Sequence, residues 1–130
     1  MNTKEYLQYH REACDKLIAI TASKNADYTG DSDDPFKNFR GVEQDGICST
    51  EQGFLTRMRD KWSRTVSLVM RQLRTGEGAR VKDETLEDTL FDFANYCILL
   101  AGWLRAKRLA ADRIALAAAK MPETPKAPLT

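Results

Sequence analysis

The chain has 130 residues, and its 20 lysine and arginine residues balance 19 aspartate and glutamate residues to a formal net charge of +1. This length allows one domain with a real hydrophobic core, and it is too short for two. The balanced charge argues against a general nucleic-acid-binding protein, which would carry a strong basic excess.

Residues 3–24 form the first predicted helix. Its apolar face, with residues at three- and four-residue spacing, consists of Tyr6, His10, Ala13, Leu17 and Ile20. Asn2 or Thr3 can cap the start, because a short polar side chain accepts hydrogen bonds from the first free backbone N–H groups. We expect His10 to lie at the edge of the core rather than to act as a catalytic base.

Residues 23–49 show no periodicity and are rich in turn formers. A loop of about 25 residues in so small a domain is more often functional or disordered than a passive connection. Its aromatic residues argue against disorder, because each needs a surface to pack on. Two alternatives stay open: the aromatic side chains pin the loop to the core, or they stack a nucleobase beside groups that hold its phosphate. The candidate ligand-binding residues of this loop are Lys24, Asn25, Tyr28, Phe36, Lys37, Asn38 and Phe39.

A second helix is predicted to begin at residue 49 or 50, because Gln52 follows Ser49 by three residues, as in a capping box. Gly76 is a natural C-terminal stop. The continuous apolar stripe of this helix is Leu55, Met58, Trp62, Val66, Val69 and Leu73. Lys61 lies at the border of this stripe and Arg64 lies on the opposite face. Each of them contacts either water, the acids of the third helix or a ligand phosphate.

The third predicted helix begins at Asp83, a good N-cap, and extends to about Lys120, either continuous or broken near Gly102. At about 100° per residue, polar and apolar residues gather on opposite faces of this helix. The polar face holds Glu84, Asp88, Asp92 and Asn95, and the apolar face holds Leu86, Leu90, Phe93, Cys97 and Leu104. We expect Asp92 and Asn95 to be partly buried, because aromatic residues flank both. A buried carboxylate needs a cation, a hydrogen-bond partner or a metal ion, so this row is the best functional signal in the chain.

Further features concern the location and ends of the domain. Cys14 and Cys97 fall in apolar helical patterns, so we expect reduced core cysteines, and the lack of a C-x-x-C pair argues against a zinc site. No N-terminal apolar signal segment is visible, and the longest apolar run is too short for a bilayer. These features predict a cytoplasmic protein without membrane association. Residues 121–130 are rich in proline, and we expect them to be disordered.

Together these elements predict an all-α fold with a single domain over residues 1–120. Two long antiparallel helices pack in a bundle with the first helix and an ordered aromatic loop. The apolar content of the last helix, with Trp103 and an alanine-rich extension, exceeds what three helices can cover. The chain is therefore expected to form a homodimer or higher oligomer.

Six stretches of the chain carry a resemblance to a known family. They are Lys24-Asn25-Ala26-Asp27-Tyr28-Thr29-Gly30, Asp34-Pro35-Phe36-Lys37-Asn38-Phe39, Gly46-Ile47, Gln52-Gly53, Arg57-Met58-Arg59-Asp60-Lys61-Trp62-Ser63-Arg64, and Asp83-Glu84 through Asn95-Tyr96. In this order, over residues 5–104, they resemble the nucleotide modification associated domain 1 family of small proteins common in phages. The resemblance implies a role with nucleotides, either in phage DNA-base modification or in blocking a nucleotide-signalled host defence.

The run Asp88-Thr89-Leu90-Phe91 followed by Asn95 is distantly similar to the MazG-type all-α nucleoside triphosphate pyrophosphatases. Those enzymes hold Mg²⁺ against a triphosphate with an E-x-x-E pair on one helix and an E-x-x-D pair on the next. Here the partner of Asp88 is displaced to Glu84, and the second helix offers only Asp60 beside Lys61. Fewer carboxylates leave less charge to hold Mg²⁺, whereas lysine and arginine can neutralise phosphate directly.

Three functions stay open. In a Mg²⁺-dependent nucleotide pyrophosphohydrolase, the metal ligands would be Glu84, Asp88 and Asp92, Asn95 would orient the substrate, and Lys61 and Arg64 would stabilise phosphate charge. In a nucleotide-binding or sequestering protein, the base would stack on Tyr28, Phe36 or Phe39 and be read by Asn25 or Asn38. Its phosphate would be held by Lys24, Lys37, Lys61 and Arg64. In a helical protein–protein interaction module without a ligand, the acid row would pair internally with Arg57, Lys61 and Arg64.

Overall fold

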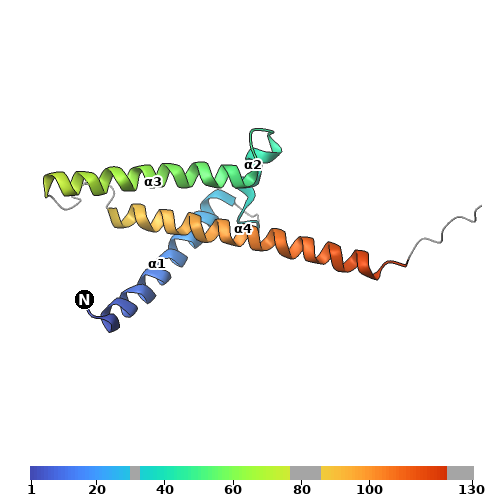
Figure 1. Cartoon of the computed structure of the whole chain (residues 1–130), viewed down its shortest axis with the longest axis horizontal. Coiled ribbons are helices and arrows are strands. Elements are labelled where there is room, and N and C mark those ends of the chain that lie inside the picture. The colour runs from blue at the N-terminus through green and yellow to red at the C-terminus, as the bar shows by residue number, and fades with distance from the viewer. Residues whose placement is uncertain (30–32, 77–85, 123–130) are drawn as a thin grey trace, which may run out of the picture. The chain divides into compact units, whose positions relative to one another are not determined.

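The protein is all-helical in a computed structural model that describes residues 1–29, 33–76 and 86–122, with side chains from 26 to 29 outside that description (Figure 1). The described residues form the helices α1 (Thr3–Thr29), α2 (Lys37–Gln44), α3 (Thr50–Thr75) and α4 (Leu86–Lys120), and no strand. The predicted all-α class is therefore confirmed. The chain divides into two compact units, Met1–Leu100 and Ala101–Thr130.

The helix ends follow local sequence signals. At the start of α1, the Glu5 backbone N–H donates to Asn2 Oδ1 over 2.9 Å and the Asn2 backbone N–H donates to Glu5 Oε2 over 2.7 Å. Ser49 and Gln52 make the same reciprocal pair at the start of α3, over 3.1 and 3.0 Å. Gly76 ends α3 at φ 63°, a left-handed conformation that glycine adopts without steric cost. These predicted caps and the predicted stop are confirmed.

The segment predicted as a loop is helical on both sides of the gap at residues 30–32. α1 extends to Thr29 instead of ending at residue 24, and Lys37–Gln44 form the short helix α2. A helix this short is marginal by itself, so α2 depends on packing against its neighbours. Its contact with α3 is close: a Cβ built on Gly53 would lie 2.9 Å from Val42 Cγ2. Packing therefore overrides the turn-forming composition of this segment.

The core of the first unit is small and partly polar. Among the described residues, the buried apolar side chains are Phe54 and Phe91, and the buried polar side chains are Thr50, Thr65 and Thr89. Phe39 of α2 stacks on Phe54 with ring centroids 3.9 Å apart, and it meets the edge of Tyr96 on α4 at 6.0 Å. The Thr50 hydroxyl donates to Glu43 over 2.7 Å, which satisfies a buried polar group. Phe39 thus joins α2, α3 and α4.

Within the first unit, α3 and the beginning of α4 run side by side in opposite directions, as predicted, and α1 crosses them at an angle (Figure 1). Trp62 of α3 lies against Phe93 of α4, with ring centroids 6.2 Å apart. Phe54, two turns earlier on α3, reaches Tyr96 through Phe39, which fits the antiparallel order. We call this pair of helices, through Leu100, the α3–α4 layer.

Several side chains expected in the core are exposed. Cys14 and Cys97 are exposed and Cys48 is half-buried, so the prediction of core cysteines is wrong, although all three thiols are free. On α3, the predicted apolar stripe is also largely exposed at Leu55, Trp62, Val66 and Leu73. The helix is rotated from the expected orientation because Phe39 packs on Phe54 instead, about 100° around the helix from Leu55.

The second unit contains the rest of α4, which ends at Lys120, as predicted. Of the two alternatives at Gly102, the continuous helix is the one observed. Its large apolar side chains are exposed, among them Leu104, Leu109, Ile114 and Leu116. In the described part of the chain, no helix is long and apolar enough to cross a membrane. Most of the tail expected to be disordered, residues 123–130, lies outside the described residues.

Candidate functional site around Asp92

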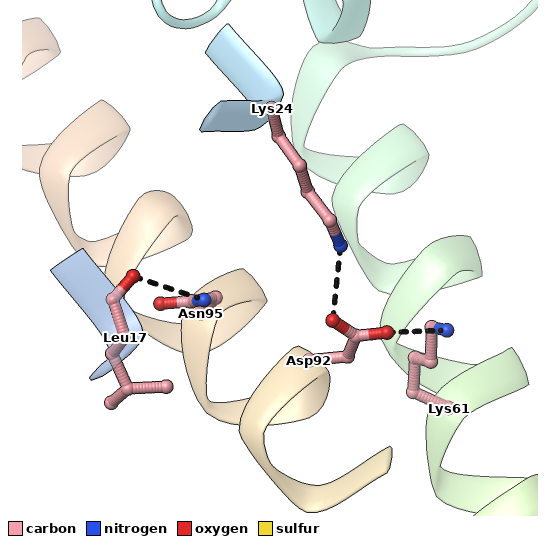
Figure 2. A network of polar contacts seen from close by, with 5 residues as sticks. All are labelled: Leu17, Lys24, Lys61, Asp92 and Asn95. Carbon is pink, nitrogen blue, oxygen red and sulfur yellow. Dashed lines mark hydrogen bonds and ion pairs between the residues drawn. The ribbon is translucent and has the colours of Figure 1, made fainter. Parts of the chain in front are cut away.

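Three helices of the first unit bring charged side chains together at Asp92 of α4. Lys24 Nζ, from α1, lies 3.0 Å from Asp92 Oδ1, and Lys61 Nζ, from α3, lies 3.0 Å from Asp92 Oδ2 (Figure 2). Each carboxylate oxygen therefore accepts a hydrogen bond from a different lysine. We call these three residues the Lys–Asp–Lys cluster.

Local sequence explains how each helix contributes to this cluster. Lys61 directly precedes Trp62, and Asp92 directly precedes Phe93, so the aromatic contact between the two helices places the two charged groups together. Lys24 reaches the same point because α1 continues past it to Thr29. Had α1 ended at residue 24, Lys24 would lie in its frayed last turn.

One turn away from Asp92, the amide of Asn95 fixes α1 on α4. Asn95 Nδ2 donates to the backbone carbonyl of Leu17 over 3.4 Å (Figure 2). Asn95 is half-buried, as predicted from its aromatic neighbours. Its described contact is with the protein backbone, which makes it a positioning group for the crossing of α1 over α4.

The cluster is partly shielded from water and carries a net positive charge. The side chain of Asp92 is 20% exposed, that of Lys61 26% and that of Lys24 49%. Burial acts to raise the pKa of Asp92, but the hydrogen bonds and charges of Lys24 and Lys61 outweigh it, so this pKa lies below its ordinary value. Asp92 is therefore a carboxylate at neutral pH, and two ammonium groups face its single charge.

Two more acids near the start of α4, Asp88 and Glu87, also contact α1. Lys16 Nζ lies 3.7 Å from Asp88 Oδ1, with both side chains about half exposed, and 4.7 Å from the centroid of the Phe91 ring. The Tyr9 hydroxyl donates to Glu87 Oε1 over 3.4 Å. Loss of water around the ring, and then the charge of Glu87, raises the pKa of Tyr9. Glu87, Asp88 and Asp92 thus each contact a cationic or hydroxyl group of α1.

The two predicted metal ligands that the structure describes, Asp88 and Asp92, are both paired with lysine. Glu84 lies outside the described residues, while Asp88 faces Lys16 and Asp92 faces two lysines. Within the described ranges, no group of three or more histidine, cysteine, aspartate or glutamate residues could hold a metal ion. A magnesium ion at Asp92 would lie close to two ammonium groups, whose positive charges would repel it. The magnesium site stays a prediction.

The predicted nucleotide-binding residues divide into several places. Lys24 and Lys61 meet at Asp92, whereas Phe39 is engaged in the core on Phe54, in agreement with the alternative that loop aromatics pin this segment. Phe36 is half-buried at the start of α2, and Lys37 and Asn38 are exposed on its first turn. Asn25 is half-buried on α1, Arg64 is exposed on α3, and the Tyr28 side chain lies outside the described residues.

Residues of the first helix were not among the predicted site residues, apart from its last turns. Tyr9, Lys16 and Leu17 contact Glu87, Asp88 and Asn95 of α4, respectively. A signal was present, because Tyr9, Lys16 and Lys24 recur at seven- and eight-residue spacing and so share one helical face. That face also holds Ala13, Leu17 and Ile20, so its lysines stand within an apolar stripe and not on a solvated face.

The chain was compared with protein-family models, with curated proteins and with solved structures, and none of them matches it.

Proposed function

We propose that this chain is a nucleotide-binding protein that holds a phosphate group at the Lys–Asp–Lys cluster. The observation that carries the proposal is the convergence of Lys24 and Lys61, from two different helices, on the single carboxylate of Asp92. Two ammonium groups beside one carboxylate leave one positive charge without a matching negative group in the cluster. A phosphate is the ligand class that such a pair of lysines binds well.

In this proposal Asp92 keeps the two lysines close together before a ligand arrives. Two adjacent ammonium groups repel each other, and the carboxylate between them removes that cost. The half-exposed Lys24 is the group that can turn toward a phosphate, while Lys61 is more firmly held by its surroundings. Asn25, half-buried one residue after Lys24, is then the nearest candidate along the chain to read a base edge.

The resemblance to the nucleotide modification associated domain 1 family supports the same ligand class. It extends the proposal to phage DNA-base modification or to sequestering a modified or cyclic nucleotide that signals host defence. In either role the protein would meet its ligand in the cytoplasm, where free nucleotides are found.

The test is a calorimetric and thermal-shift screen of nucleotides, modified nucleotides and cyclic dinucleotides, each with Mg²⁺ and with chelator. We expect at least one nucleotide to raise the melting temperature without Mg²⁺. Lys61→Met and Lys24→Met should each weaken binding about tenfold, the loss of one charge-assisted contact. Lys4→Met, which removes an exposed lysine from the opposite end of α1, is the matched control.

Asp92→Asn gives the sharpest result, because it releases both lysines from their carboxylate. The bound phosphate then takes the place of the carboxylate between the two ammonium groups and no longer competes with it, so binding of phosphate should tighten by several-fold, whereas a variant that had lost its fold would bind nothing. The proposal fails if no nucleotide changes the melting temperature, or if both lysine variants bind as the unchanged chain does.

A second candidate is a Mg²⁺-dependent nucleoside triphosphate pyrophosphohydrolase. The observation that favours it is the position of Asp88 one turn before Asp92, so that both carboxylates and the two lysines lie along one side of α4. Its requirement is release of pyrophosphate that needs Mg²⁺ and is abolished by Asp88→Asn. Asp92→Asn separates the candidates, because it should abolish turnover by an enzyme and strengthen binding by a simple phosphate binder.

A further inference from the structure

A broad apolar surface covers the side of the α3–α4 layer that faces away from the Lys–Asp–Lys cluster. We call it the uncovered face, and its residues are Leu55, Trp62, Val66, Met70 and Leu73 of α3 with Leu90 and Cys97 of α4. The exposed fraction of its side chains on α3 runs from 41% at Val66 to 73% at Leu73. These seven residues are uncharged, but the exposed Arg59 falls within the same arc of α3, where its guanidinium donates to Ser63 over 2.8 Å.

The uncovered face is continuous across the two helices. On α3 its members follow one another at spacings of seven, four, four and three residues, which keeps them within one narrow arc of the helix. Trp62 contacts Phe93 of α4, and Leu90 and Cys97 stand three residues before and four residues after Phe93, on the same side of that helix. The aromatic contact therefore joins the two stripes into one surface.

The surface lies opposite the contact with α1. Lys61 and Asp92 immediately precede Trp62 and Phe93, and they point to Lys24 of α1. A step of one residue turns a side chain by about 100° around a helix, so the aromatic pair and the charged pair mark different sides of the layer. α1 thus covers the charged side and leaves the aromatic side open.

We propose that a second copy of this chain covers the uncovered face, so that two α3–α4 layers form a four-helix core. A fully exposed large apolar residue presents about 200 Å² of surface. With the exposed fractions of the large side chains of this face, their exposed surface amounts to about 600 Å². That area is near the upper end for single patches on monomeric proteins, and it is most of the roughly 800 Å² that each partner buries in a stable complex.

Three further observations favour a copy of the same chain over a different partner. A two-fold axis pairs each surface with itself, and a largely apolar face is complementary to itself, with Arg59 as the charged residue in its arc on α3. The net charge of +1 gives little repulsion between copies. In the described residues, only Phe54 and Phe91 are buried apolar side chains, so the single chain has a small core that a second α3–α4 layer would enlarge.

Sedimentation equilibrium of the full chain tests this proposal. We expect the unchanged chain to be a dimer at about 10 µM. Trp62→Lys should weaken self-association at least about 100-fold, because it replaces an aromatic side chain at the interface by a charge that the dimer would bury. Arg57→Glu is the matched control: it inverts an exposed charge on the opposite side of α3 and should leave the dimer intact. The proposal is overturned if the unchanged chain stays monomeric at about 100 µM. It is also overturned if Trp62→Lys leaves the oligomer unchanged, or if Arg57→Glu weakens self-association as much as Trp62→Lys does.

A second measurement decides the question if Trp62→Lys does not fold. In a Trp103→Phe variant, Trp62 is the remaining tryptophan, and it is about half exposed in the single chain. Its emission maximum should shift to longer wavelength as the protein is diluted through the range in which the dimer dissociates. An emission maximum independent of concentration, while the sedimenting mass changes, would place the interface elsewhere. The proposed nucleotide site lies on the other side of the layer. A failure to detect nucleotide binding would therefore leave the dimer measurement unaffected.

Discussion

Replacing Asp92 by asparagine should destabilise the protein at neutral pH by about 1–2 kcal/mol. Both carboxylate oxygens of Asp92 accept hydrogen bonds from lysine, each over 3.0 Å. A hydrogen bond to a charged group contributes about 1.5–3 kcal/mol when shielded, and an exposed ion pair about 0.2–1 kcal/mol. The contact with Lys61, 26% exposed, lies between these limits, whereas Lys24, 49% exposed, belongs near the lower one.

The loss should depend on pH in a defined direction. Burial acts to raise the pKa of Asp92, but the two lysines hold it below its ordinary value in the folded chain. A lowered pKa means that the stabilisation is present above the unfolded value, about 3.9, and is lost as the pH falls through the folded value. The difference in unfolding free energy between the unchanged chain and Asp92→Asn should therefore be constant near pH 7 and shrink below about pH 4.

Urea unfolding followed by far-ultraviolet circular dichroism, at one fixed protein concentration from pH 7 to pH 3, measures this difference. Asp60→Asn is the control, because Asp60 is an exposed aspartate on α3. Its stability should differ little from that of the unchanged chain at any pH. Equal stability of Asp92→Asn and the unchanged chain at pH 7 would refute the reasoning, and so would a difference that persists undiminished at pH 3.

Three further substitutions test the packing of α2 and α3. Phe54→Ala should cost about 3–5 kcal/mol of unfolding free energy, because this fully buried ring stacks on Phe39, and a cost below about 1 kcal/mol in urea unfolding would contradict that packing. Ser49→Ala removes half of the capping box of α3 and should cost about 1 kcal/mol, whereas Ser49→Asp should retain most of the stability. Gly53→Ala should destabilise by about 1–2 kcal/mol although alanine is the better helix former, because its Cβ would lie 2.9 Å from Val42 Cγ2. Adding Val42→Ala should recover part of that loss, and strictly additive effects in the double variant would show that the close approach is unimportant.

Signals that act over one helical turn were readable in the sequence. The Ser49–Gln52 capping box and the stop at Gly76 depend only on neighbouring residues, and both are present as predicted. The partial burial of Asp92, and its need for a cation, also followed from the aromatic residues beside it. Each of these features depends on the residue pattern within a single helix, so the sequence was enough to predict it.

Features that depend on contacts between helices were not readable in the same way. The cations at Asp92 and Asp88 come partly from α1, as Lys24 and Lys16, and which lysine meets which acid depends on where α1 crosses α4. Similarly, the apolar stripe of α3 did not reveal that Phe54 would be buried and Leu55 exposed. That rotation is set by Phe39 of α2, a helix whose turn-forming composition concealed it.

The contacts that attach α1 to the α3–α4 layer differ in physical character from those that attach α2. The described side-chain contacts of α1 with α4 are mostly polar and partly exposed, as at Lys24 and Lys16, whereas α2 is held by the stacked rings of Phe39 and Phe54. Dissolved salt weakens ion pairs between exposed side chains, such as those of Lys24 and Lys16, but it does not weaken apolar contacts. Rising ionic strength should therefore speed amide hydrogen exchange in α1 while exchange in α2 stays slow. The protein would then contain a helix whose opening responds to its ionic surroundings, fastened to a layer that does not respond.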